Sequence, residues 1–229
     1  MVDAPRPAAT LLGTVVQSSL SSQNSNIQLA EQSELPQDAT LTFSLRSQYP
    51  ATFAHDESIE VATGDESSTT TLNFSNGGMM LENSQVAVAT LNPAKAFGGA
   101  AFGPLLYRVS AKGVAGDWQP LANLVRLPTL RDLRCPATPE LACKLSGSNL
   151  FLIDSVSADP KFTQSVKVPD GFLGGALPVP HPITGSLYVK LRDNPSVVNA
   201  TSLVMQEIPA SPEASARADA RGPGLSDER

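Results

Sequence analysis

The chain has 229 residues, a formal net charge of −6, 41% hydrophobic residues, 17% charged residues and 5% aromatic residues. This length allows one large or two small domains with real hydrophobic cores. The negative charge and the lack of any lysine and arginine cluster argue against duplex nucleic acid or an anionic membrane as the partner, and no apolar run approaches a membrane span.

The N-terminal stretch MVDAPRPAATLLGTVVQ has neither the basic start nor the long apolar segment of a secretory signal. Its apolar run, Leu11 to Val16, predicts a first strand. An exported chain of this kind would therefore be a fragment, or the tail of a longer protein whose signal lies upstream. A cytoplasmic protein is the simpler alternative.

Strand periodicity dominates the first half of the chain. In TLTFSLR the apolar side chains alternate with polar ones, which is typical of a strand with one buried face. The same alternation recurs in three later segments, whose inward pairs are Ile59 and Val61, Leu72 and Phe74, and Val86 and Val88. Asn76-Gly77 supplies the positive φ of a tight turn, so residues 69–82 are predicted to form a hairpin.

A glycine-rich loop follows from Ala96 to Pro104, and Phe97 and Phe102 are expected to anchor it to the core. The next two apolar segments flank the short connection AKGVAG, which predicts a second hairpin with Tyr107 and Trp118 as its large residues.

The pattern as a whole predicts an all-β protein of two tandem immunoglobulin-like β-sandwich modules. Helical periodicity is weak, and 19 prolines and 16 glycines interrupt the strands every eight to twelve residues. We place the first module at residues 1–127 and the second, smaller one at residues 128–207. Residues 208–229 are rich in Ala, Ser, Pro and charge, which predicts a disordered tail.

The second module resembles an IPT/TIG-type immunoglobulin-like domain over residues 143–206. The resemblance is carried by KLSGSNLFLIDSV with Leu145, Gly147, Asn149 and Leu150, and by the later segments VPDGF and VPHPITGSLYVKL. The proline-rich stretch around His181 departs from the family pattern. Such domains imply a spacer or binding role on bacterial surface and secreted proteins rather than catalysis. In the first module, LLYRVSAKGVAGDWQPL resembles the closing hairpin of fibronectin-III-like domains.

Cys135 and Cys143, the two cysteines of the chain, enclose a short loop stiffened by prolines. We predict a disulfide, which would stabilise the fold by about 2.5 kcal/mol and fits an oxidising compartment. Two reduced thiols are the alternative, and a zinc site is disfavoured because no histidine is nearby in sequence. Because the loop follows the module boundary, we expect it to set the angle between the modules.

No local signal supports catalysis or a cofactor. A phosphate-binding loop and a nucleophile elbow are missing from the sequence, although a Ser-His-Asp triad or a pair of carboxylates could still converge in the fold. Four acids in the region after His55 are candidate oxygen ligands for calcium, namely Asp56, Glu57, Asp65 and Glu66, but their spacing fits no calcium-binding loop pattern. We therefore predict no enzyme activity, no cofactor and no metal.

Two function classes remain. The leading hypothesis is a structural or adhesive module of a larger bacterial secreted or surface protein, with other domains of a longer chain, surface proteins or glycans as partners. The alternative is a carbohydrate-binding module. Its stacking platform would come from exposed aromatic rings, for which the candidates are Trp118, Tyr107, Tyr188 and Tyr49.

Overall fold

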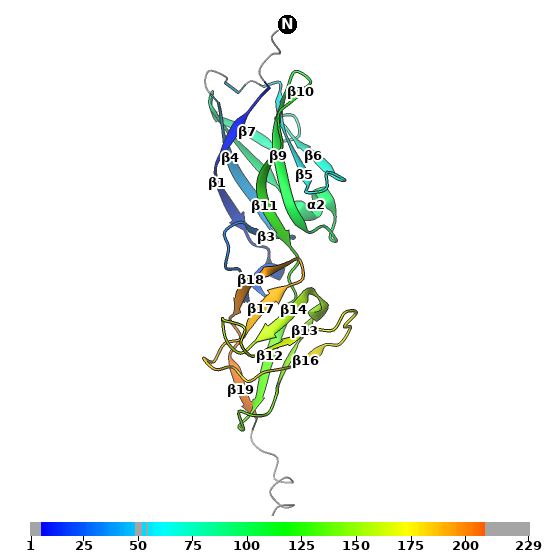
Figure 1. Ribbon diagram of the computed structural model, residues 1–229. Helices are drawn as coiled ribbons and strands as arrows, with labels where there is room; N and C mark the ends of the chain where they lie inside the picture. Colours follow the sequence, from blue (N-terminus) through cyan, green and yellow to red (C-terminus); the bar gives the residue numbers. More distant parts are fainter. Residues whose placement is uncertain (1–5, 49–51, 54, 209–229) are drawn as a thin grey trace, which may run out of the picture.

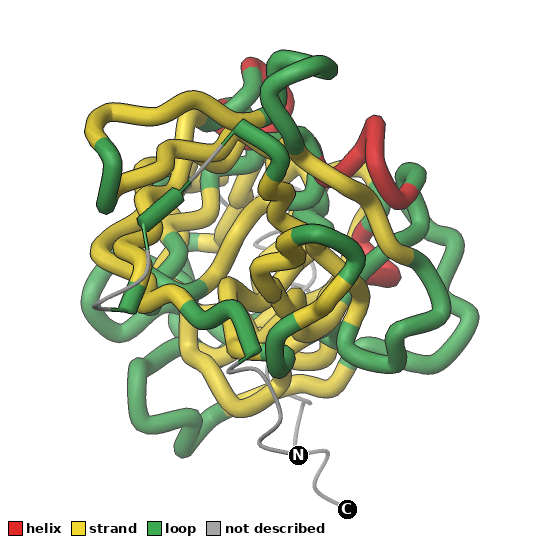
Figure 2. The backbone as a smooth tube through the Cα atoms, turned by 90° about the horizontal axis from the view of Figure 1, so that it is seen from above, coloured by secondary structure: helices red, strands yellow, loops and turns green. Residues whose placement is uncertain are grey.

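The computed structural model describes residues 6–48, 52–53 and 55–208, and most of these residues lie in strands (Figure 1). Two β-sandwiches stack end to end into an elongated molecule, which confirms the predicted all-β class with tandem sandwiches. Seen along the long axis, the strands of both sandwiches overlap within one compact outline (Figure 2). The predicted disordered tail lies outside the described residues from position 209 onward. No helix in the described part is long and apolar enough to span a membrane.

The first sandwich packs two sheets face to face. One sheet has the order β1-β4-β8-β7 and the other the order β3-β11-β9-β5-β6, with β10 added beside β9. The strand bounds are β1 Ala9–Gln17, β3 Glu34–Pro36, β4 Thr40–Ser47, β5 Glu57–Thr63, β6 Thr69–Leu72, β7 Met79–Asn83, β8 Val86–Leu91, β9 Gly103–Ala111, β10 Val114–Ala115 and β11 Gln119–Val125.

Alternation decides which side chains enter the core between these sheets. In β4 the three predicted inward residues Leu41, Phe43 and Leu45 are each at most 1% exposed, and Ile59 and Val61 meet them from the opposite sheet. These residues form strands because every second side chain removes apolar surface from water while its neighbours stay at the surface.

The second sandwich has one sheet of order β16-β13-β12-β19 and one of order β15-β14-β17-β18-β2. Its strand bounds are β12 Thr129–Pro136, β13 Cys143–Ser148, β14 Ile153–Ser157, β15 Ser165–Lys167, β16 Ala176–Val179, β17 Tyr188–Leu191, β18 Asn194–Thr201 and β19 Met205–Ile208, together with β2 Ile27–Gln28. A separate core fills it, and Leu133, Leu145 and Val189 are fully buried there.

The described residues also include three short helical turns: α1 (Leu20–Gln23), α2 (Pro93–Phe97) and the 3-10 turn η1 (Leu150–Leu152). The Asn92 side chain caps α2 by accepting a hydrogen bond from the Lys95 amide at 3.0 Å. Phe97 packs against the first core as expected, whereas Phe102 is 53% exposed and does not anchor its loop.

The hairpin predicted over residues 69–82 is wrong. β6 pairs with β5 and β7 pairs with β8, so the turn between them carries the chain from one sheet to the other. The predicted turn chemistry is confirmed, because Gly77 has a φ of 71° and the Asn76 side-chain oxygen accepts hydrogen bonds from the amides of Asn73 and Gly78. The second predicted hairpin is confirmed as well, with β9 antiparallel to β11 and Tyr107 opposite Gln119.

Candidate functional site

The joint between the two sandwiches is held by polar contacts between residues far apart in the chain. Between β1 and β3 the chain leaves the first sandwich, and β2 pairs with β18 as the edge strand of a sheet in the second sandwich. Asn26 has a φ of 58°, and its Nδ2 donates to the Leu130 carbonyl at 2.7 Å. The N-terminal segment therefore contributes strands to both sandwiches, since β1 and β3 belong to the first and β2 to the second. The division of the chain at residue 128 remains a prediction.

An ion pair between Arg126 and Asp193 also links the two sandwiches at the joint. Arg126 ends the first sandwich, and its Nε and Nη2 donate to the two carboxylate oxygens of Asp193 at 2.9 and 2.6 Å. The Arg126 backbone amide donates to the same carboxylate at 2.8 Å, and the Asp193 side chain is only 2% exposed. These hydrogen bonds raise the pKa of Arg126. The guanidinium also lies 4.2 Å from the centre of the Phe102 ring, which gives that exposed ring a packing partner.

Glu34 places a second carboxylate in the joint. It is 3% exposed at the start of β3, and its Oε1 accepts a hydrogen bond from Asn194 Nδ2 of β18 at 3.0 Å. Its Oε2 has no hydrogen-bond partner among the described residues. Burial raises the pKa of Glu34 because the charged form loses its hydration.

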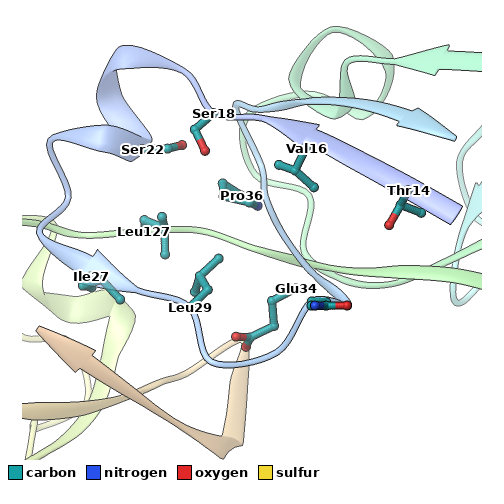
Figure 3. A pocket seen from close by; sticks show the side chains of 10 residues that line it. Thr14, Val16, Ser18, Ser22, Ile27, Leu29, Glu34, Pro36 and Leu127 are labelled. Carbon is teal, nitrogen blue, oxygen red and sulfur yellow. The ribbon is translucent and has the colours of Figure 1, made fainter.

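A hollow of about 450 Å³ lies beside Glu34 at the joint. Figure 3 shows the Glu34 side chain at its edge, next to Leu29. On the second sandwich, Asn199 Oδ1 accepts a hydrogen bond from the Ala30 amide at 2.9 Å, which ties the segment after β2 to β18. Backbone pairing, an ion pair and amide side chains therefore hold the two sandwiches together at several separate points.

The predicted disulfide between Cys135 and Cys143 is confirmed. Both residues are at most 1% exposed, and a ring nitrogen of His181 lies within 4.8 Å of the sulfurs. This Cys–His cluster is the one group of three or more His, Cys, Asp or Glu side chains in the described part of the chain that lie close enough together to hold a metal ion. Sulfurs joined in a disulfide are not thiolate ligands, so the disulfide form offers a metal only the imidazole.

The disulfide does not set the angle between the modules, contrary to expectation. β12 begins at Thr129 near the joint, and Cys135 lies six residues further along, which in an extended strand is about 20 Å. There Cys135 lies opposite Glu207 of β19, and Figure 1 shows β19 at the end of the second sandwich that is away from the first. Arg126, Asp193 and Asn26 hold the joint instead, and sequence reasoning missed them because their partners are distant in the chain.

The aromatic candidates do not share one face. Tyr107 was wrongly expected as a stacking residue: it is 3% exposed, its hydroxyl donates to the Ala9 carbonyl at 3.2 Å, and burial raises its pKa. Trp118 is half-buried, with the Arg108 guanidinium 4.2 Å from its ring centre and its Nε1 donating to Glu66 at 2.9 Å. Tyr188 is half-buried on β17 of the second sandwich, and Tyr49 lies outside the described residues.

Two of the acids considered as calcium ligands are engaged by the protein itself. Asp65 accepts hydrogen bonds from the hydroxyls of Thr63 and Ser67 at 2.7 and 2.9 Å, which lowers its pKa. Glu66 accepts the indole hydrogen bond from Trp118. Both carboxylates therefore have roles in the turn between β5 and β6.

The comparisons with known proteins identify no family. No family model matches the sequence, and no curated protein matches it. Among solved structures, the chain is similar to SGBP-B of the Bacteroides ovatus mixed-linkage glucan utilization locus, in complex with a mixed-linkage heptasaccharide, at 9% identity and a TM-score of 0.23. The match covers 74% of this chain and 53% of that one, so it spans about half the length of that protein. A TM-score this low carries no argument about function.

Proposed function

We propose that this chain is a non-catalytic spacer that holds other parts of a larger bacterial secreted or surface protein at a fixed separation. The elongated shape supports this role. β1 starts at the outer end of the first sandwich and β19 ends at the opposite end of the second, so the described chain enters and leaves at opposite poles (Figure 1). A chain that runs from pole to pole can separate whatever is attached to its two ends.

The observation that carries the proposal is the half-buried ion pair between Arg126 and Asp193 at the joint. Linked domains move relative to each other by default unless their interface is extensive. Here Arg126 and Asp193 form a two-pronged ion pair in which the Asp193 side chain is 2% exposed and the Arg126 side chain 26% exposed, and the strand exchange of β2 adds backbone hydrogen bonds across the same joint. Bending that separates the two groups would leave the Asp193 carboxylate buried without its counter-ion, so the pair opposes bending at the joint.

The disulfide and the resemblance of residues 143–206 to IPT/TIG-type domains fit the same proposal. The Cys135–Cys143 disulfide fits an exported protein, since such bonds persist in secreted and surface proteins. The IPT/TIG-like resemblance of residues 143–206 implies a spacer or binding role of the same kind. Both points support the proposed location outside the cytoplasm.

The test is the stiffness of the joint in solution. The double substitution Arg126→Ala with Asp193→Ala removes both charges together, so no unpaired charge remains buried. We expect small-angle X-ray scattering of the variant to show a broader distribution of interatomic distances and a shorter mean end-to-end length than the wild type, with circular dichroism unchanged.

The matched control removes the exposed pair of Arg6 and Asp117, whose side chains are 69% and 71% exposed. Exposed pairs contribute little, so this variant should scatter like the wild type. A wild-type chain that already samples many orientations of its two sandwiches would rule out the spacer proposal.

A further inference from the structure

The outer face of one sheet in the second sandwich carries a hollow of about 520 Å³. Its floor is set by strand register: Tyr188 of β17 lies opposite Ala200 of β18, and Ala200 lies opposite Gln28 of β2. A large ring, a methyl group and an amide side chain thus stand in one row across three strands. The outer strands of such a row are about 10 Å apart, so the small central residue leaves a depression wide enough for one sugar ring.

The side chains around this Tyr188 hollow are uncharged, with both polar and apolar residues among them. Among its lining residues there is no Asp, Glu, Lys, Arg or His, although 17% of the whole chain is charged. Lys190, the next outward residue of β17, is instead directed to the Phe162 ring, 4.8 Å from its centre. A phosphate or carboxylate ligand would therefore find no counter-ion here, which argues against an anionic ligand.

Several of these polar groups have unused hydrogen-bonding capacity. The side chains of Gln28, Thr184, Ser186 and Tyr188 make no hydrogen bond to any other residue in the described part of the chain. They offer hydroxyl and amide donors and acceptors around a half-exposed aromatic ring. Polar groups placed around an apolar surface are how ligand sites fix orientation and specificity.

We infer that the Tyr188 hollow is a binding site for a neutral carbohydrate. A neutral sugar presents hydroxyls at its edges and an apolar C–H face, and it needs no counter-ion. The ring of Tyr188 receives the apolar face, Ala200 leaves room for it, and Gln28 and Ser186 bond the hydroxyls. This activity goes beyond the spacer role and does not depend on the stiffness of the joint.

Isothermal titration calorimetry of the whole chain tests this site with three neutral tetrasaccharides, cellotetraose, xylotetraose and mannotetraose, and with trigalacturonate as the anionic counterpart. We expect at least one neutral probe to bind and trigalacturonate not to bind. Tyr188→Ala should raise the Kd about tenfold or more, because truncated aromatic anchors dominate binding energies. Tyr188→Phe keeps the ring and should lose less affinity.

Trp118→Ala is the matched control, since it removes a half-buried aromatic ring from the other sandwich. It should leave binding unchanged. The inference is overturned if none of the three neutral probes binds, if trigalacturonate binds as tightly as they do, or if Tyr188→Ala binds like the wild type. Scattering by the Tyr188→Ala variant should match the wild type, so a failure here is distinct from a failure of the spacer proposal.

Discussion

At the joint, the surroundings of a single side chain such as Glu34 affect stability in a way that its neighbours in the sequence do not indicate. Glu34 reads in the sequence as one more polar residue before Leu35-Pro36, yet its side chain is buried against Asn194 from the other sandwich. One carboxylate oxygen is paired and the other is not, in an environment that disfavours charge. The joint is therefore held together in spite of this acid when it is ionised.

The charge of Glu34 predicts a pH dependence of stability. Because its pKa is raised in the folded state, the native protein holds the proton more tightly than the unfolded chain does, and this contribution to stability is complete below the ordinary glutamate value. Stability is then lost as the pH rises from about 4.5 through the raised pKa, and it levels off above that. Glu34→Gln should remove this pH-dependent loss and raise the free energy of unfolding by about 1 kcal/mol at pH 7.

Urea denaturation of both proteins between pH 4 and pH 8 measures the effect. The two stability curves should converge at the acidic end and separate toward neutral pH. Parallel curves over the whole range would show that Glu34 is not responsible.

At the level of strands, close approaches between backbones matter as much as the apolar pattern. Gly147 of β13 faces the start of β12, where the register shifts between Leu130 and Asp132. A Cβ built on Gly147 would lie 2.3 Å from the Thr129 carbonyl oxygen, which no real side chain tolerates. Glycine at this position is required by the neighbouring backbone rather than by its own φ.

Gly147→Ala should therefore destabilise the protein by about 2–3 kcal/mol through forced separation of β12 and β13. Gly13→Ala is the matched control, because Gly13 also lies in a strand, has no positive φ, and would hold a Cβ with no other atom within 4 Å. Its effect should be near zero or slightly stabilising. Equal midpoints for the two variants in thermal unfolding would contradict this account.

Across the whole molecule, two separate cores share one joint. The first core draws on β1 and on strands from β3 to β11. The second draws on strands from β12 to β19 together with Ile27 of β2, and it contains the disulfide. A substitution in one core should therefore lower the stability mainly of its own sandwich. The cysteine pair is a suitable site for this test because Cys135 lies opposite Glu207 of β19, the strand that Figure 1 shows farthest from the first sandwich.

Replacing both cysteines by alanine should cost the second sandwich about 2.5 kcal/mol, because the unfolded chain regains the freedom of the closed loop. Hydrogen exchange followed by mass spectrometry should show faster exchange in β12, β13 and β16, with the first sandwich unchanged. Equal loss of protection in both sandwiches would mean that the molecule unfolds as a single cooperative unit.

The sequence by itself determined the fold class, the faces of the main strands, the second hairpin and the disulfide. These features depend on short-range patterns: a period of two, turn residues and two cysteines eight positions apart. Only the tertiary structure decided that β6 and β7 belong to different sheets, that β2 crosses into the second sandwich, and that Arg126 meets Asp193. The last two pairings join residues far apart in the chain. For β6 and β7 the apolar alternation fits a hairpin between them as well as it fits the observed pairings with β5 and β8, so the local pattern does not select the partner. Tyr107 and Tyr188 look alike in sequence, and only packing buries one ring and leaves the other beside a hollow.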